Sequence, residues 1–267
     1  MKIIFIADSH VYYCDQHKRV QVMMDSIHRE KPDVVCNLGD IGEVLISKDT
    51  TIIQELFSFQ PTLFVAGNHD LYTSDRRHAP PQAMDEFLKV VQWGIPLQTY
   101  WNDSKTTYEK DDVVFIGTIG FPDFSHPKMI MPTRYYDDGC PTIDATYMNL
   151  KGGWLQHTRP LIDAFEKKLK LADAGKHSTV VVITHYPIFE SQYRLNPTDD
   201  ISVYFYCHRI GQLVLQAAQR NPSKQFYCVA GHGHEYNINR WFDMADNVKT
   251  FGFVTDYNEQ RFEMLEV

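Results

Sequence analysis

Five short apolar runs, far apart in the sequence, are each followed at once by residues of the types that commonly bind metals. The runs cover residues 2–7, 33–37, 62–66, 179–183 and 225–230. Their length and apolar content are typical of strands that are buried on both faces of a sheet. Such strands need another layer on each side, so the runs indicate a layered α/β fold.

Polar segments begin where each of these strands is expected to end. They are Asp8-Ser9-His10, Gly39-Asp40, Gly67-Asn68-His69-Asp70, Thr184-His185 and Gly231-His232-Gly233-His234. Open α/β sheets bind ligands in the crevice beyond the carboxyl ends of their strands. We therefore expect the five segments to converge at one edge of the molecule.

The segments between the first apolar runs have the periodicity of helices. Apolar side chains at helical spacing predict one helix over 15–30 and another over 80–91. Between them, Ser47 or Asp49 is expected to begin a further helix that ends near Phe57. This alternation predicts β-α-β units, whose parallel strands are joined by right-handed crossovers.

The middle and the end of the chain predict a second sheet. Helices are expected over 142–174, with a break at Gly152-Gly153, and over 209–220. Additional strands are expected at 98–101, 106–109, 113–118, 249–254 and 261–267, the last two extending the second sheet. The sequence thus predicts two mixed sheets with helices outside, in one domain over 1–267.

Two irregular segments, 120–141 and 186–206, are expected to lie beside the site, because long loops often border active sites. Their aromatic side chains could stack a base or another ring, or could simply pack between the loops, which is the commoner use of aromatics. Arg134 and Arg194 could bind a phosphate or be ordinary surface residues. The aromatics are Phe121, Phe124, Tyr135, Tyr136, Tyr186, Phe189, Tyr193, Tyr204, Phe205 and Tyr206.

Charge and hydropathy exclude some partners. The formal net charge is -8 and the sequence pI is about 5.8, which argues against long nucleic acid, because that partner normally needs a basic face. The first apolar run is too short for a signal-peptide core, and no run approaches transmembrane length. We expect no membrane partner, and the oligomeric state is not predicted.

The cysteines favour a reducing environment. Their number is odd, they have no close paired spacing, and two fall inside predicted strands. Reduced thiols predict a cytoplasmic location. The five are Cys14, Cys36, Cys140, Cys207 and Cys228.

Each polar segment is a weak signal alone, because a single Asp-x-His or Gly-Asp often arises by chance. A lone His such as His185 is more often an ordinary hydrogen-bonded side chain, and Asn68-His69-Asp70 could be a turn that leads into a helix. The pair His232 and His234 is stronger, because the flanking glycines allow a close approach to one centre. The conjunction of five segments, each after its own strand, indicates a metal centre.

Together and in this order, the five segments resemble the signature of the calcineurin-like metallophosphoesterase family, from Asp8 to His234. The resemblance implies a four-layer α-β-β-α sandwich with two metal ions at the carboxyl ends of the central strands. It implies that Asp40 bridges both ions. The ligands implied for one ion are Asp8, His10 and His234, and those for the other are Asn68, His185 and His232.

The same resemblance leaves His69 unliganded beside the substrate, where an imidazole serves as acid or hydrogen-bond donor. Asp70 could orient that imidazole, or could merely cap the next turn. Glu43 follows Asp40 without the acidic residue that is common later in this motif. The departure removes no implied ligand.

Oxygen and imidazole donors without thiolate suit two Mn, Fe, Zn or Ni ions. Two such ions about 3.5–4 Å apart can share a hydroxide that attacks phosphorus. The expected function is hydrolysis of a small phosphomonoester or phosphodiester, with nucleotides among the candidates. Two alternatives remain open, a non-catalytic scaffold of the same fold and a nuclease.

Overall fold

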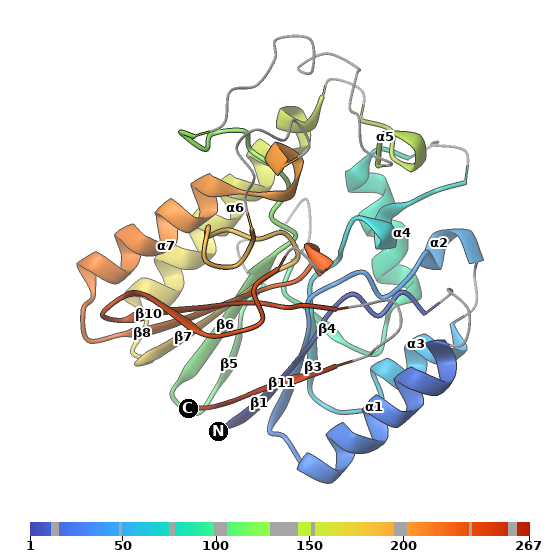
Figure 1. Cartoon of the computed structure of the whole chain (residues 1–267), viewed down its shortest axis with the longest axis horizontal. Helices are drawn as coiled ribbons and strands as arrows, with labels where there is room; N and C mark the ends of the chain where they lie inside the picture. Colours follow the sequence, from blue (N-terminus) through green and yellow to red (C-terminus); the bar gives the residue numbers. More distant parts are fainter. Residues whose placement is uncertain are drawn as a thin grey trace.

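Two β-sheets lie face to face, and helices cover their outer faces (Figure 1). This arrangement confirms the predicted α/β fold of two mixed sheets flanked by helices. The computed structural model describes residues 1–11, 16–47, 50–74, 78–98, 106–128, 144–150, 153–194, 202–234, 237–255 and 261–267. Among these residues, no helix combines the length and the apolar character needed to cross a membrane.

The first sheet has the strand order β11-β1-β2-β3-β4. Its strands are β1 (Lys2–Ile6), β2 (Val34–Asn37), β3 (Thr62–Phe64), β4 (Ile95–Pro96) and β11 (Glu263–Glu266). The first four run parallel, and β11 pairs antiparallel with β1. The helices that connect them are α1 (Gln16–Glu30), α2 (Val44–Ser47), α3 (Thr51–Leu56) and α4 (Pro80–Val90).

The second sheet has the order β5-β6-β7-β8-β10-β9. Its strands are β5 (Tyr108–Lys110), β6 (Val113–Thr118), β7 (Thr179–Thr184), β8 (Gln225–Ala230), β9 (Phe242–Ala245) and β10 (Val248–Gly252). The four central strands are parallel and the two edge strands antiparallel. Its helices are α6 (Trp154–Ala174) and α7 (His208–Arg220), and further short helices in the described residues are α5 (Asp144–Tyr147), η1 (His69–Leu71) and η4 (Ser202–Phe205).

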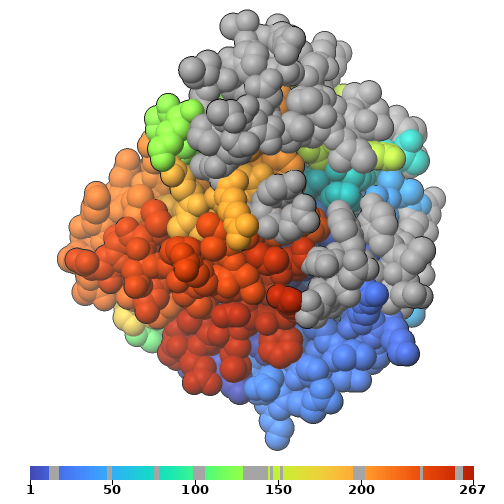
Figure 2. All heavy atoms as spheres, in the orientation of Figure 1, coloured from blue at the N-terminus to red at the C-terminus, as the bar shows by residue number. Residues whose placement is uncertain are grey.

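The apolar runs explain this layering. Successive side chains of a strand point to opposite faces, so a run without polar residues must be covered on both sides. In β1, Ile3 and Phe5 pack between the sheets, while Ile4 and Ile6 pack in the core cluster that contains helix residues such as Met23. Figure 2 shows the N-terminal residues in blue and the C-terminal residues in red on adjoining parts of the surface.

The predicted helices are found with small shifts. The region predicted over 142–174 is divided into α5 and α6, and Gly153 adopts a φ of 78° just before α6 begins. The helix expected after Ser47 or Asp49 begins at Thr51, while Ser47 ends the preceding α2 and Asp49 lies outside the described residues.

One predicted sheet assignment is wrong. Residues 261–267 were expected to extend the second sheet, but β11 pairs with β1 of the first sheet, with Lys2 opposite Glu266. The two chain ends therefore lie together (Figure 1). The sequence of a short strand indicates its two faces, but it does not indicate which distant sheet edge the strand joins. Of the strand predicted at 98–101, residues 99–101 lie outside the described residues.

A buried lysine ties the two sheets together. Lys168 of α6 is fully buried, and its Nζ donates hydrogen bonds to the carbonyl oxygens of Leu97 at 2.7 Å and Gly117 at 2.5 Å. Leu97 follows β4 of the first sheet, while Gly117 belongs to β6 of the second. The ammonium group thus satisfies carbonyl groups from both layers.

We predict that Lys168→Ala lowers the free energy of unfolding by about 2 to 4 kcal/mol, because two buried carbonyls lose their donor. Urea denaturation of the metal-free protein measures this loss. Lys167→Ala is the matched control, since Lys167 is exposed on the same helix. Equal stability of the two variants would contradict the bridging role.

Candidate metal centre

All five polar segments lie directly beyond the carboxyl ends of β1, β2, β3, β7 and β8, as the sequence predicts. Backbone hydrogen bonds hold neighbouring segments side by side: His10 N–H donates to Asp40 O at 3.0 Å, and Gly231 N–H donates to His185 O at 3.0 Å. These bonds join the first segment to the second and the fourth to the fifth, although the members of each pair are far apart in the chain.

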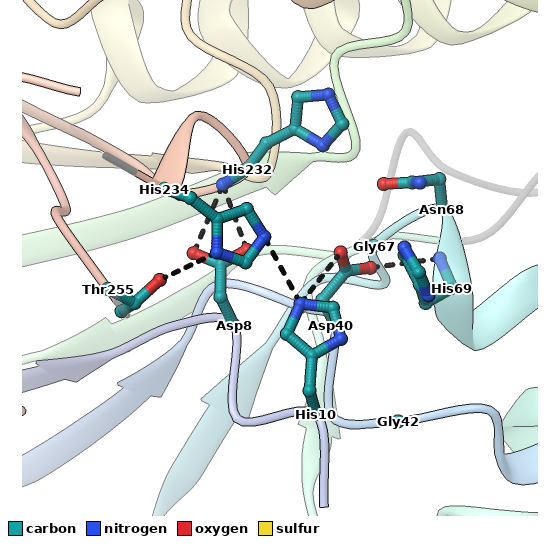
Figure 3. A network of polar contacts seen from close by, with 12 residues as sticks. Asp8, His10, Asp40, Gly42, Gly67, Asn68, His69, His232, His234 and Thr255 are labelled. Atoms are coloured by element: carbon teal, nitrogen blue, oxygen red, sulfur yellow. Dashed lines mark hydrogen bonds and ion pairs between the residues drawn. The ribbon is translucent and has the colours of Figure 1, made fainter. Parts of the chain in front are cut away.

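One group of side chains gathers around Asp8. The candidate metal-binding atoms of Asp8, His10, Asp40 and His234 all lie within 4.8 Å of one another. His10 Nε2 is 3.3 Å from His234 Nε2 and 3.7 Å from Asp40 Oδ2. Figure 3 shows these side chains pointing toward one another from separate loops.

A second group shares Asp40 with the first. The candidate atoms of Asp40, His185 and His232 also lie within 4.8 Å of one another. His185 Nε2 is 3.3 Å from Asp40 Oδ2, 3.1 Å from His232 Nδ1 and 2.9 Å from Asn68 Oδ1. The structure thus brings together all seven side chains that were predicted as ligands, with Asp40 common to both groups.

Hydrogen bonds outside the cluster fix two of the imidazole rings. His185 Nδ1 lies 2.9 Å from the carbonyl oxygen of Leu38, which can only accept, so Nδ1 carries a proton and Nε2 is the nitrogen that faces the cluster. His234 Nδ1 lies 3.4 Å from Thr255 Oγ1, and its Nε2 faces His10. Metal-binding histidines are usually oriented in this way by the second ring nitrogen.

Burial and mutual charge set the protonation of the cluster. Burial lowers the pKa of His10 and of His232 well below the ordinary value, so both rings are neutral near pH 7. Burial would also lower the pKa of His185, but the carboxylate of Asp40 outweighs it and raises that pKa to about 9. In return, His185 and His69 hold the pKa of Asp40 well below its ordinary value despite burial.

The backbone is strained where these side chains begin. Five of the eight described non-glycine residues with positive φ belong to the cluster: Asp8 (51°), His10 (41°), Asp40 (50°), His232 (65°) and His234 (43°). Left-handed φ is unfavourable for residues with a Cβ, and it persists where the surrounding structure enforces it, often at functional sites. The strands end in turns that aim the side chains inward.

Two glycines allow the loops after β2 and β3 to touch. Gly39 has a φ of 96°, and a Cβ on it would lie 2.4 Å from the backbone nitrogen of Gly67. A Cβ on Gly67 would lie 2.0 Å from Asp40 Oδ1. Neither position accommodates a side chain, which is the close approach that glycine permits.

The cluster fits metal ions by the chemistry of its donors. Imidazole nitrogens face each other at 3.1 and 3.3 Å, so without a cation between them one nitrogen of each pair must carry a proton. A cation between such nitrogens would contact both lone pairs. Carboxylate, amide and imidazole donors suit first-row transition metals, and two groups joined by Asp40 are consistent with a two-metal site.

His69, predicted as the catalytic imidazole, lies beside the first group. Its ring centroid is 4.7 Å from that of His10, and its backbone N–H donates to Asp40 Oδ1 at 2.9 Å. Its Nδ1 is 3.7 Å from Glu43 Oε1. Burial alone would lower the pKa of His69, but the carboxylates of Asp40 and Glu43 outweigh it and raise that pKa.

Glu43 is one residue that sequence reasoning missed. The motif around Asp40 assigns it no role, although a carboxylate three residues after the shared Asp40 is visible in the sequence. Which imidazole it reaches depends on the turn at 41–43, and a sequence motif does not define that turn. The structure places it 3.7 Å from His69.

Asp70, the other predicted catalytic residue, is fully buried and contacts backbone. Its carboxylate accepts hydrogen bonds from Gly67 N–H at 2.8 Å and Gly42 N–H at 3.2 Å. Burial and the nearby Asp40 raise its pKa to about 7, against the opposing effect of these two bonds. Both donors precede Asp70 in the chain, so these bonds differ from a cap on the next turn, and an effect of Asp70 on His69 stays a prediction.

Most aromatics of the two irregular segments pack inside the protein. Six of the described side chains are buried, while Phe124 and Phe205 are partly exposed. The buried ones are Phe121, Tyr186, Phe189, Tyr193, Tyr204 and Tyr206. Tyr135, Tyr136 and Arg134 lie outside the described residues, and Arg194 is exposed. Packing between the loops is therefore their main use in the described part of the chain.

The fold and the cluster together define a class of protein: an α-β-β-α sandwich with a buried His/Asp metal-binding cluster at the carboxyl ends of its central strands. A family model described as calcineurin-like phosphoesterase matches residues 1–236. The chain belongs to the calcineurin-like phosphoesterase family.

Two solved structures share this fold over nearly their whole length. A phosphopantetheinyl hydrolase from Mycobacterium tuberculosis superimposes with a TM-score of 0.67 and 13% identity, covering 96% of this chain and 89% of the other. A dimetal phosphatase from Danio rerio gives 0.62 and 16%, covering 99% and 91%. Comparison with curated protein sequences gives no significant match. At such low identity the likeness shows the fold alone.

We predict that Mn²⁺ raises the unfolding temperature of the metal-free protein and that Asp40→Asn removes most of this rise. A ligand at about 100 times its Kd stabilises the folded state by about 2.7 kcal/mol, and Asp40 belongs to both donor groups. Differential scanning fluorimetry measures the shift. Asp112→Asn is the control, because Asp112 bonds Ser178 away from the cluster, and it should keep the full shift.

Proposed function

We propose that the protein is a two-metal phosphoesterase that hydrolyses a small phosphomonoester or phosphodiester. The observation that carries the proposal is the shared position of Asp40 in two groups of buried donors. Membership of a phosphoesterase family supports the reaction class. The two similar structures, a phosphopantetheinyl hydrolase and a dimetal phosphatase, agree with this class but leave the substrate open.

In this proposal Asp40 would help to hold both ions. Asp8, His10 and His234 would hold one ion with it, and Asn68, His185 and His232 would hold the second. Mn, Fe, Zn and Ni are the candidate metals for such donors. When bound, the ions would supply Lewis acidity toward the phosphoryl oxygens and would activate water.

His69 would protonate the oxygen of the leaving group. Its position is fixed by the bond from its backbone N–H to Asp40 Oδ1 and by the packing of its ring on Tyr72, at 4.4 Å between centroids. Glu43 helps the imidazole to keep its proton until the leaving group takes it. Asp70 would act indirectly, because it holds the backbone of Gly42 and Gly67 in place.

We predict that His69→Ala lowers kcat by about 10²- to 10⁴-fold, the usual contribution of a general acid, while two metal ions remain bound. The loss should be larger for phenyl phosphate than for p-nitrophenyl phosphate, because p-nitrophenolate leaves readily without a proton. Steady-state kinetics with both esters, together with elemental analysis, measure this. An equal loss with both leaving groups would argue against the acid role.

Glu43→Gln tests the partner of His69. Because Glu43 raises the pKa of His69, its loss lowers that pKa, and a group that must be protonated then loses its proton at lower pH. We therefore predict that the alkaline limb of the kcat profile shifts to lower pH. Glu166→Gln is the control, since Glu166 pairs with Lys170 on the surface of α6.

A panel of metals and substrates tests the whole proposal. Metal-free protein is loaded with Mn²⁺, Fe²⁺, Zn²⁺ or Ni²⁺ and assayed with p-nitrophenyl phosphate and bis(p-nitrophenyl) phosphate. The expected result is metal-dependent hydrolysis of at least one ester. Less than one ion per chain after loading, without hydrolysis, would favour the scaffold, and salt-sensitive cleavage of nucleic acid without ester hydrolysis would favour the nuclease.

A further inference from the structure

Asp144 joins α5 to the metal centre, although nothing in its sequence surroundings points to this role. Its side chain is buried, and its Oδ1 accepts a hydrogen bond from Asn68 Nδ2 at 2.8 Å and another from the hydroxyl of Tyr72 at 2.7 Å. Asp144 and Asn68 are 76 residues apart in the sequence. The contact is therefore purely tertiary.

The first consequence concerns Asn68. Its amide nitrogen donates to both Asp144 Oδ1 and the Tyr72 hydroxyl, the latter at 3.1 Å. An amide has its donor nitrogen and its acceptor oxygen on opposite branches. With the nitrogen held toward Asp144, the oxygen faces His185 Nε2 at 2.9 Å. Only the oxygen can bind a metal ion, so Asp144 selects which atom of the amide faces the cluster.

The second consequence concerns His69. The ring of Tyr72 packs against that of His69 and also stacks on that of Tyr147 of α5, with 5.0 Å between the centroids of the two tyrosine rings. Thr73 N–H also donates to Tyr147 O at 3.1 Å. The Tyr72 hydroxyl accepts a hydrogen bond from Asn68 and donates one to Asp144, so hydrogen bonds link the side chains of Asn68, Tyr72 and Asp144 to one another. One carboxylate thus restrains both the amide and the aromatic neighbour of His69.

We propose that Asp144 is a positioning residue of the metal centre, which holds Asn68 Oδ1 toward His185 and Tyr72 against His69. The inference rests on the proposed function for the role of Asn68 as a ligand. The proposed role depends on the acceptor oxygen of Asp144 and not on a direct contact of Asp144 with metal or substrate.

The test compares two substitutions of different chemistry. Asp144→Leu keeps a similar side-chain size but removes the acceptor. Asp144→Asn keeps an oxygen with two lone pairs, which can accept both bonds. Isothermal titration of metal-free protein with Mn²⁺ measures the affinity of each ion without relying on activity.

We expect wild-type protein to bind two ions. In Asp144→Leu one of the two binding events should weaken by roughly 10- to 100-fold, the usual effect of losing a partner that orients a ligand. In Asp144→Asn both events should stay close to wild type. This rescue separates the positioning role from a general loss of packing or of negative charge.

Asp123→Leu is the matched control. Asp123 is also buried, and it accepts hydrogen bonds from the backbone N–H groups of His208 and Arg209 at the start of α7. Its loss should lower thermal stability but leave both metal affinities unchanged. If Asp123→Leu is less stable than the wild type but binds two ions with wild-type affinity, lower stability alone does not weaken the site.

The outcomes distinguish the two proposals. If wild-type protein binds no metal, the proposed function fails. If it binds two ions and Asp144→Leu binds both with unchanged affinity, only the positioning role is overturned. The role is also overturned if Asp144→Asn binds metal as weakly as Asp144→Leu, because the acceptor oxygen would then not be the deciding feature.

Discussion

The burial of the Asp40 carboxylate is the constraint on which the centre depends. A charge removed from water is costly unless other groups compensate for it, and here the compensation comes from His185, whose pKa is raised, and from the backbone N–H of His69. Asp40 and these two partners belong to three different loops. The sheets must therefore bring the loops together before the charge can be accommodated.

The sheets meet this requirement because their central strands are anchored on both faces. The cluster residues leave their strands with left-handed φ at five positions, a conformation that a flexible loop would abandon. Apolar side chains from both sheets fill the layer between them, including Phe5, Leu63, Val181 and Val229. Rigid packing beneath the site thus sustains the strained turns above it.

The sequence predicts the parts of the structure that follow from local pattern. Apolar runs identify the strands that carry the cluster, because burial on both faces leaves a pattern that can be read within six residues or so. The seven predicted donors converge because parallel strands place their carboxyl ends at one edge. The position of β11 beside β1 was missed, since register with a distant edge leaves no local trace.

The orientation of the donors depends on contacts between separate loops, and the sequence predicted it poorly. Three further carboxylates surround the cluster, and each contacts a different kind of group: Asp70 binds backbone N–H groups, Glu43 lies near an imidazole, and Asp144 binds an amide and a phenol. Their partners are set by the paths of separate loops and not by spacing along the chain. The strands decide which donors meet, whereas the three carboxylates hold groups beside the donors and, through Asp144, the amide of Asn68 itself. A substitution among the donors should therefore change what the centre can bind, whereas one among the surrounding carboxylates should change how well it is aligned.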